Sequence, residues 1–124
     1  MIETGLVTLL KTVNSRVYPR TPQQPTFPFI RYQRIGRDDE SSIDGKATGL
    51  TDYSFQIDCM AKSYSEAKQL AAQVQALLNR YQGSIGDSFC QYATLETEND
   101  FDEQDGDDYT HWVSQRYVIY TNDE

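Results

Sequence analysis

Apolar residues recur at helical spacing in two segments of the chain. In both segments the apolar positions lie three or four residues apart, which is the repeat of one face of an α-helix. The first segment runs from about residue 2 to 15 and the second from about residue 63 to 82. Ser63 and Glu66 form a capping box at the start of the second segment, and Gly83 follows where a helix would stop. The pattern predicts two amphipathic helices.

Alternating apolar and polar positions predict strands in the rest of the chain. The clearest alternation lies between Leu50 and Ala61, where the apolar set is Tyr53, Phe55, Ile57, Cys59 and Ala61. Three further segments, residues 29–35, 88–97 and 109–121, are rich in aromatic and β-branched side chains. The order of elements predicts an α+β fold, a four-stranded, mainly antiparallel sheet with two helices packed on one face and with protruding loops and hairpins. At 124 residues the chain has the size of one domain, residues 1–124.

Three connecting segments have distinct compositions. Residues 18–28 contain four prolines, which favours an extended connector. Residues 36–49 form a polar tract with three glycines, which predicts a mobile loop or a long hairpin tip. Residues 98–108 contain the Asp105-Gly106 step, which suits a hairpin between the last two strands.

The acidity of the chain belongs to that last hairpin. The net charge is -8, from 19 acidic and 11 basic residues, and eight of the acids lie between Glu96 and Asp108 without a base among them. The remaining 11 acids balance the 11 bases. A surface with this sign repels phosphate, so the hairpin does not favour nucleic-acid binding.

The residue types that carry catalysis are scarce. His111 is the only histidine and lies in a predicted strand, and Cys59 and Cys90 lie in two other strands, where a thiol usually behaves as a small buried apolar group. We expect both thiols to be free, although two strands that lie side by side would also permit a disulfide. A calcium loop of the EF-hand type would have glycine sixth, and counting back from Gly106 places Phe101 at the first ligand position. We therefore predict no catalytic residues, no cofactor and no metal site.

No stretch of the sequence approaches the roughly 18 apolar residues that a membrane-spanning helix needs. We therefore expect no membrane partner. Arg31, Arg34 and Arg37 recur every third residue, which on a strand divides them between its two faces. Such a division suits contacts at a protein interface or with solvent better than a platform for nucleic acid.

The order of these segments resembles that of the tail completion proteins of long-tailed bacteriophages, also described as tail terminator or tail-to-head joining proteins. The resemblance covers nearly the whole chain. It rests on a helix that ends near Val17-Tyr18-Pro19, a proline before the aromatic strand 29–35, the strand 53–59 that leads into the capped helix, and an Asp-rich turn at residues 100–106 before a closing aromatic strand, Tyr117-Val118-Ile119-Tyr120. The length and acidity of residues 96–108 depart from the family pattern.

The resemblance implies a virion structural protein without enzymatic activity. It implies a ring, usually of six copies, that caps the tail tube at the head-proximal end and forms the tail-side surface for head-tail joining. The partners would be the chain itself, the major tail tube protein and the head completion or connector protein, and DNA would pass through the lumen without specific binding. Assembly would take place in the cytoplasm of a host bacterium. The candidate interface residues are the charged residues of the two projecting segments: Arg34, Arg37, Asp38, Asp39, Glu40, Asp44, Lys46, Asp102, Glu103, Asp105, Asp107 and Asp108.

Two other function classes remain as alternatives. Eight carboxylates in a short segment would suit an acidic inhibitor that mimics DNA, but such a mimic needs charge spread along a surface rather than confined to one turn. A small enzyme is the third class, and the sequence offers it no recognisable site.

Overall fold

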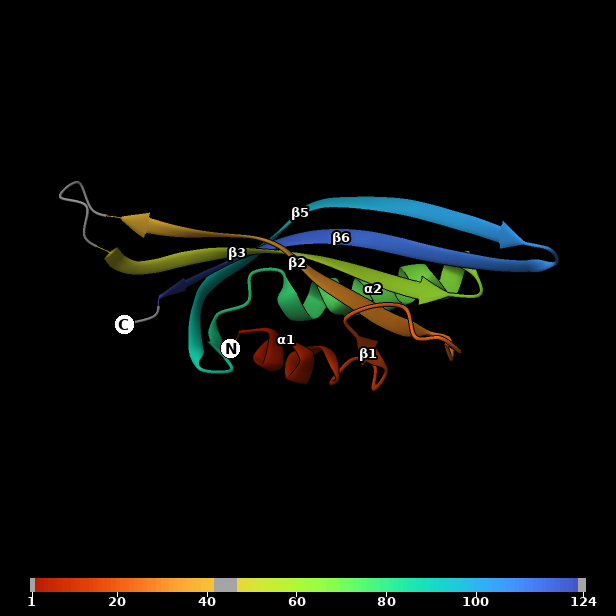
Figure 1. Ribbon diagram of the computed structural model, residues 1–124, viewed down its shortest axis with the longest axis horizontal. Helices are drawn as coiled ribbons and strands as arrows, with labels where there is room; N and C mark the ends of the chain where they lie inside the picture. Colours follow the sequence, from red (N-terminus) through yellow and green to blue (C-terminus); the bar gives the residue numbers. More distant parts are fainter. Residues whose placement is uncertain (1, 42–46, 123–124) are drawn as a thin grey trace.

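The computed structural model describes residues 2–41 and 47–122. These residues form two helices and one sheet of six strands. Both helices lie against the same side of the sheet, as Figure 1 shows. The helices are α1 (Ile2–Leu10) and α2 (Tyr64–Leu78), and the strands are β1 (Val17–Tyr18), β2 (Phe29–Ser41), β3 (Ala47–Ala61), β4 (Gly83–Ile85), β5 (Ser88–Asp105) and β6 (Asp108–Asn122).

The predicted four-stranded, mainly antiparallel sheet is wrong, because the described sheet has six strands and is mixed. The strand order is β1-β2-β3-β6-β5-β4. β1 runs parallel to β2, and every other neighbouring pair is antiparallel. The two strands that the sequence missed contain only two and three residues, and segments so short leave no period in the pattern of apolar positions.

The core lies between the helices and one face of the sheet. The alternating residues of β3 that the sequence marked as apolar are buried, from Tyr53 to Ala61. Leu6 and Leu10 of α1 and Val74 of α2 are fully buried in the same cluster. α1 approaches the turn between β4 and β5 so closely that a Cβ on Gly5 would overlap the backbone of Gly86. Glycine is therefore required at residue 5.

Both helices end earlier than the sequence predicted. Ser63 caps the start of α2, because its hydroxyl oxygen accepts a hydrogen bond from the Glu66 amide at 3.2 Å. The helix ends at Leu78, before Arg80 adopts the left-handed conformation with φ of 68°. The prediction that Gly83 stops the helix is wrong, since Gly83 lies in β4. α1 ends at Leu10 rather than near residue 15.

The proline-rich connector packs on the face of the sheet opposite the helices. Arg31 of β2 donates to the carboxylate of Asp58 at 2.6 and 2.9 Å and to the hydroxyl of Thr21 in the connector at 2.8 Å. The ammonium group of Lys62 lies 4.5 Å from the ring centroid of Phe27. Asp58, which the alternation placed on an exposed face, is therefore only 3% exposed.

The two charged segments are largely strand. Residues 36–41 continue β2 and residues 47–49 begin β3, so the described part of the polar tract is a pair of strands rather than a loop. Residues 98–105 belong to β5, and Asp105 pairs with Asp108 across a turn formed by Gly106 and Asp107. Gly106 has φ of 63°, a conformation that glycine adopts without strain at the first central position of a type II′ turn.

Candidate functional site

The two thiols are free and buried, as the sequence predicted. Loss of hydration on burial raises the pKa of Cys90 to about 11. Burial, reinforced by the nearby carboxylates of Asp58 and Glu98, raises the pKa of Cys59 further still. Because the thiolate is the reactive form, both cysteines are suited to packing rather than to nucleophilic chemistry at neutral pH.

His111 lies on β6 among aromatic side chains. Its ring stacks on Tyr109 with the centroids 6.2 Å apart, and meets the ring of Tyr64 edge-on at 6.4 Å. Within residues 2–41 and 47–122, no group of three or more His, Cys, Asp or Glu side chains could hold a metal ion. In the same part of the chain, no helix is both long and apolar enough to cross a membrane.

The base of the acidic hairpin is anchored to α2. The Lys68 ammonium lies 2.9 Å from a carboxylate oxygen of Asp100 and 3.5 Å from one of Glu98. The Tyr64 hydroxyl donates a hydrogen bond to Asp100 at 3.0 Å. The hydrogen bond from Lys68 is the main cause that lowers the pKa of Asp100. The first acidic residues of the hairpin are thus held against the body of the protein.

A series of buried hydrogen bonds connects Glu98, at the base of the hairpin, to the core. The Gln115 side-chain amide donates to Glu98 at 2.9 Å and to the backbone oxygen of Ala71 in α2 at 3.0 Å. The Tyr117 hydroxyl donates to the Gln115 side-chain oxygen at 2.9 Å. Gln115 and Tyr117 are both fully buried, so these bonds satisfy polar groups that water cannot reach. The network fixes the position at which the acidic hairpin leaves the body.

The tip of the acidic hairpin is exposed. β3 pairs with β6 only as far as His111, so beyond it β5 and β6 continue as a two-stranded ribbon. None of the five candidate acids here forms an ion pair with a described residue: Asp102, Glu103, Asp105, Asp107 and Asp108. The tip is therefore a concentrated and accessible source of negative charge.

The other predicted group lies on β2. Arg34 forms an exposed ion pair of 3.2 Å with Glu3 of α1, and the guanidinium of Arg37 lies 5.7 Å from the ring centroid of Tyr53. Asp39 and Glu40 lie on the same strand, and Asp38 is exposed on it. Asp44 and Lys46 lie outside the described residues.

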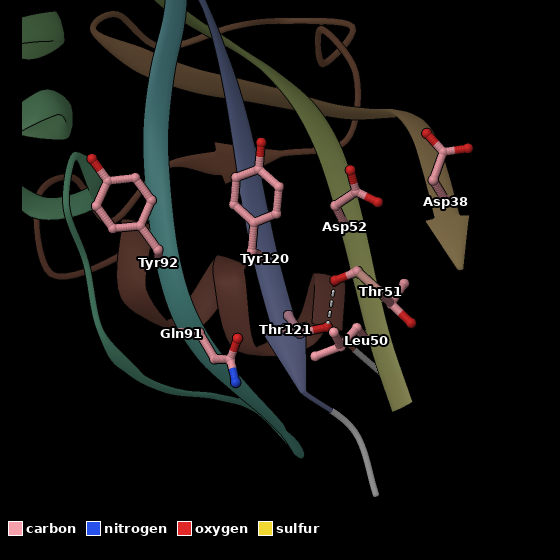
Figure 2. A pocket seen from close by; sticks show the side chains of 8 residues that line it. All are labelled: Asp38, Leu50, Thr51, Asp52, Gln91, Tyr92, Tyr120 and Thr121. Carbon is pink, nitrogen blue, oxygen red and sulfur yellow. Dashed lines mark hydrogen bonds between the residues drawn. The ribbon is translucent and has the colours of Figure 1, made fainter. Parts of the chain in front are cut away.

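A hollow that the sequence did not predict lies beside the β2 group, on the face of the sheet without helices. Its volume is about 520 Å³. Figure 2 shows Tyr92 and Tyr120 side by side, with Asp52 and Asp38 across the sheet from them. Two carboxylates and two phenol groups suit the recognition of a basic or hydrogen-bonding side chain. The only signal in the sequence was that Tyr92 and Tyr120 occupy positions next to buried residues of their strands, which places them on the opposite face.

The candidate residues form two groups rather than one site. In Figure 1 the β5–β6 turn and the far ends of β2 and β3 lie at opposite ends of the long axis of the molecule. The two charged groups are therefore well separated on one sheet.

Comparison with known proteins agrees with a role in assembly. No curated protein sequence matches the chain at a significant level. A chain in a solved structure described as the virion of a native gene transfer agent particle has the same fold, with a TM-score of 0.65 and 16% identity over 97% of this chain and 90% of that chain. The family described as tail completion protein gp17 matches residues 4–122. The chain therefore belongs to the tail completion protein gp17 family, and it is a structural protein of a virion tail.

Proposed function

We propose that copies of this chain form a closed ring that caps the tail tube and provides the tail-side surface for joining the head. The neighbours in this proposal are the chain itself, with six copies to a ring, the major tail tube protein and the head completion or connector protein. Membership of the tail completion family supports the general role.

The observation that carries the proposal is the separation of the two charged projections. A cap must contact the tube on one side and the head on the other, and it must also contact its own copies. The far ends of β2 and β3 and the acidic tip of β5 and β6 lie at opposite ends of one sheet (Figure 1). The sheet between them has a single core, and the base of the acidic hairpin is anchored to α2, so both surfaces belong to one folded unit.

We assign the far ends of β2 and β3 to the contact with the last ring of the tube. This end carries charges of both signs, Arg37 and Asp38, which suit a polar rim that fixes register between proteins. We assign the acidic tip to the lumen of the ring, through which DNA passes. Carboxylates repel the phosphate backbone, so DNA would move past the tip without binding to it.

The alternative prediction of a DNA mimic has less support. Along β5 the acids are divided between the two faces of the strand, since Glu98 and Asp100 point towards α2 while Glu103 lines a hollow beside Trp112 on the other face. Only part of the charge therefore lies on any one surface. Family membership also favours the virion tail.

The ring can be tested on the purified protein. Size-exclusion chromatography with light scattering over a range of concentrations should show a closed oligomer, or an equilibrium that moves towards one as concentration rises. Virions without the protein should have tails of abnormal length that fail to join filled heads. A chain that stays monomeric at all concentrations, or normal joined tails in its absence, would contradict the ring.

The lumen assignment has a separate test. In the variant with Asp102, Asp105, Asp107 and Asp108 changed to Asn, we expect normal tails joined to heads but slower delivery of DNA, because the repulsion is removed. The matched control changes Asp38 and Asp52 to Asn, which alters the same type of residue at the hollow near the other end of the sheet. Delivery at the normal rate from the tip variant would show that the tip does not face the DNA.

A further inference from the structure

Two long strands of the sheet have a partner on only one side for most of their length. β4 covers β5 through three residue pairs, the last of them Gly83 with Cys90. β1 covers β2 through two pairs, at Ile30 and Arg31. Beyond the residues paired with β1 and β4, the outer edges of β2 and β5 have no strand beside them among the described residues. β5 runs along the outside of the sheet in Figure 1. Such edges are templates for pairing with another chain.

The backbone groups that point out from β5 can be identified. Asp105 and Asp108 close a two-residue turn and form a hydrogen-bonded pair, and such pairs alternate with pairs whose backbone groups point away from the partner. The backbone N–H and C=O groups of Glu98, Asp100, Asp102 and Gln104 therefore point out from the edge of the sheet. Towards the start of the strand the outer edge is already occupied. There the Arg80 amide donates to the Ala93 oxygen at 2.7 Å, and the Leu95 amide donates to the Asn79 side chain at 3.1 Å.

The same alternation identifies the outward groups of β2. The Ile30 amide donates to the Arg16 oxygen at 2.9 Å, so Ile30 faces outward and is occupied. Tyr32 and Arg34 follow at alternate positions. The register shift between Arg34 and Gly36 moves the next outward position to Arg37. Beyond Ile30, the outward positions of β2 are therefore Tyr32, Arg34 and Arg37. They are equal in number to Glu98, Asp100 and Asp102 on β5.

The outer edges of β2 and β5 carry opposite charges on the same face of the sheet. The side chains of Arg34 and Arg37 lie on the helix side of the sheet, next to Glu3 of α1 and the ring of Tyr53. Those of Glu98 and Asp100 lie on the same side, next to Lys68 of α2. Joining the two edges in one continuous sheet would thus place arginines and carboxylates on the same face, where opposite charges on adjacent strands attract.

The directions of the strands agree with such a join. Three successive antiparallel steps separate β2 from β5, so the two strands run in opposite directions. A second copy in the same orientation would therefore present its β2 antiparallel to the β5 of the first. In this direction Arg34 can lie opposite Asp100, with Arg37 opposite Glu98 and Tyr32 opposite Asp102. A parallel join would instead bring the acids at the end of β2 towards the acidic end of β5.

We propose that neighbouring copies are joined by antiparallel pairing between the outer edge of β5 (residues 98–102) in one copy and the outer edge of β2 (residues 32–37) in the next. The inference rests on the proposed ring and specifies its subunit contact. The interface is heterologous, because each copy would pair through β5 with one neighbour and through β2 with the other. The occupied positions Ile30 on β2 and Leu95 on β5 limit the length of the join, and the pairing of arginines with carboxylates favours this register.

A pair of cysteines tests the register. In the Arg34→Cys/Asp100→Cys variant, residues on neighbouring copies would face each other with Cα atoms about 5.5 Å apart, within the range of a disulfide. Mild oxidation should give a ladder of covalent multimers. The matched control is Arg34→Cys/Phe101→Cys, since Phe101 stacks on Trp112 on the opposite face. The native cysteines are buried and should not contribute. The control and both single variants should remain monomeric on denaturing gels.

A proline tests the backbone contact. Asp102→Pro removes an amide hydrogen that points out from the sheet and makes no bond to β6, so the fold should survive, as circular dichroism would show. Assembly should be lost in light scattering, whereas Asp102→Asn should assemble as the wild type does. Rings that form equally from the proline variant, without cross-linking of the cysteine pair, would overturn the edge pairing and leave the ring intact. A wild-type chain that is always monomeric, with no cross-link, would overturn both proposals.

Discussion

β5 passes through two different environments along its 18 residues. In its first half Cys90 and Ala93 are fully buried against the core, whereas every residue from Glu96 to Asp105 is exposed. Burial holds the first half of the strand, because apolar side chains there leave water. The second half depends on pairing with β6 and on surface contacts such as the stacking of Phe101 on Trp112, with centroids 5.4 Å apart.

The comparison shows that core packing is confined to the first half of the strand, and under the proposed edge pairing the exposed half would serve assembly. Mutations in the buried half should change the free energy of unfolding, while mutations in the exposed half should change contacts with other proteins. The three predictions below test this division, beginning with the largest effect.

The largest effect is expected from truncating the core. Phe55→Ala removes a fully buried ring and should lower the free energy of unfolding by roughly 3–5 kcal/mol, because the cavity cannot fully collapse. Urea denaturation followed by circular dichroism measures the loss. The control is Phe101→Ala in the exposed arm, where the ring is 48% exposed and the loss should stay below about 1.5 kcal/mol. Equal losses would show that the arm belongs to the same cooperative core.

The second effect concerns a buried charge on the face without helices. Arg31→Met removes both hydrogen bonds from the guanidinium to Asp58, whose side chain is 4% exposed. The carboxylate then lacks its cationic partner, and the loss should be about 1.5–3 kcal/mol. Arg116→Met is the matched control, since its ion pair with Glu96 is exposed and 3.8 Å long. The control should change stability by no more than about 0.5 kcal/mol.

The smallest effect is electrostatic and local to the base of the arm. Lys68 lowers the pKa of Asp100, so this contact stabilises the fold above the ordinary pKa of an aspartate, and the contribution is lost as pH falls through the lowered pKa. Lys68→Met should move the pKa of Asp100 upwards in an NMR titration of the side-chain carboxyl group. The control is Lys62→Met, which removes a lysine beside Phe27 and should leave the pKa of Asp100 unchanged. An unchanged pKa in the Lys68 variant would show that the contact does not persist in solution.

The long periodic elements could be predicted because a single repeat over many residues carries the information. The alternation along β3 identified its buried face from Tyr53 to Ala61, and the capping box located the start of α2 at Ser63. The free, buried state of Cys59 and Cys90 followed from the same strand assignments.

The features that the sequence did not reveal depend on contacts between distant segments. β1 and β4 are strands only because β2 and β5 lie beside them. Asp58 is buried only because the connector that carries Thr21 crosses its face of the sheet. The hollow at Tyr92 and Tyr120 combines four strands, so no local pattern could indicate it.

The sequence by itself determined the two helices, the four long strands, the acidic segment and the absence of the usual catalytic motifs. Each of these follows from residues close together in the chain, where spacing directly sets which side chains share a face. Only the tertiary structure decided which strand edges stay unpaired and which charges reach them. That outcome depends on the order of strands in the sheet, which long-range packing fixes and which leaves no periodic trace in the chain.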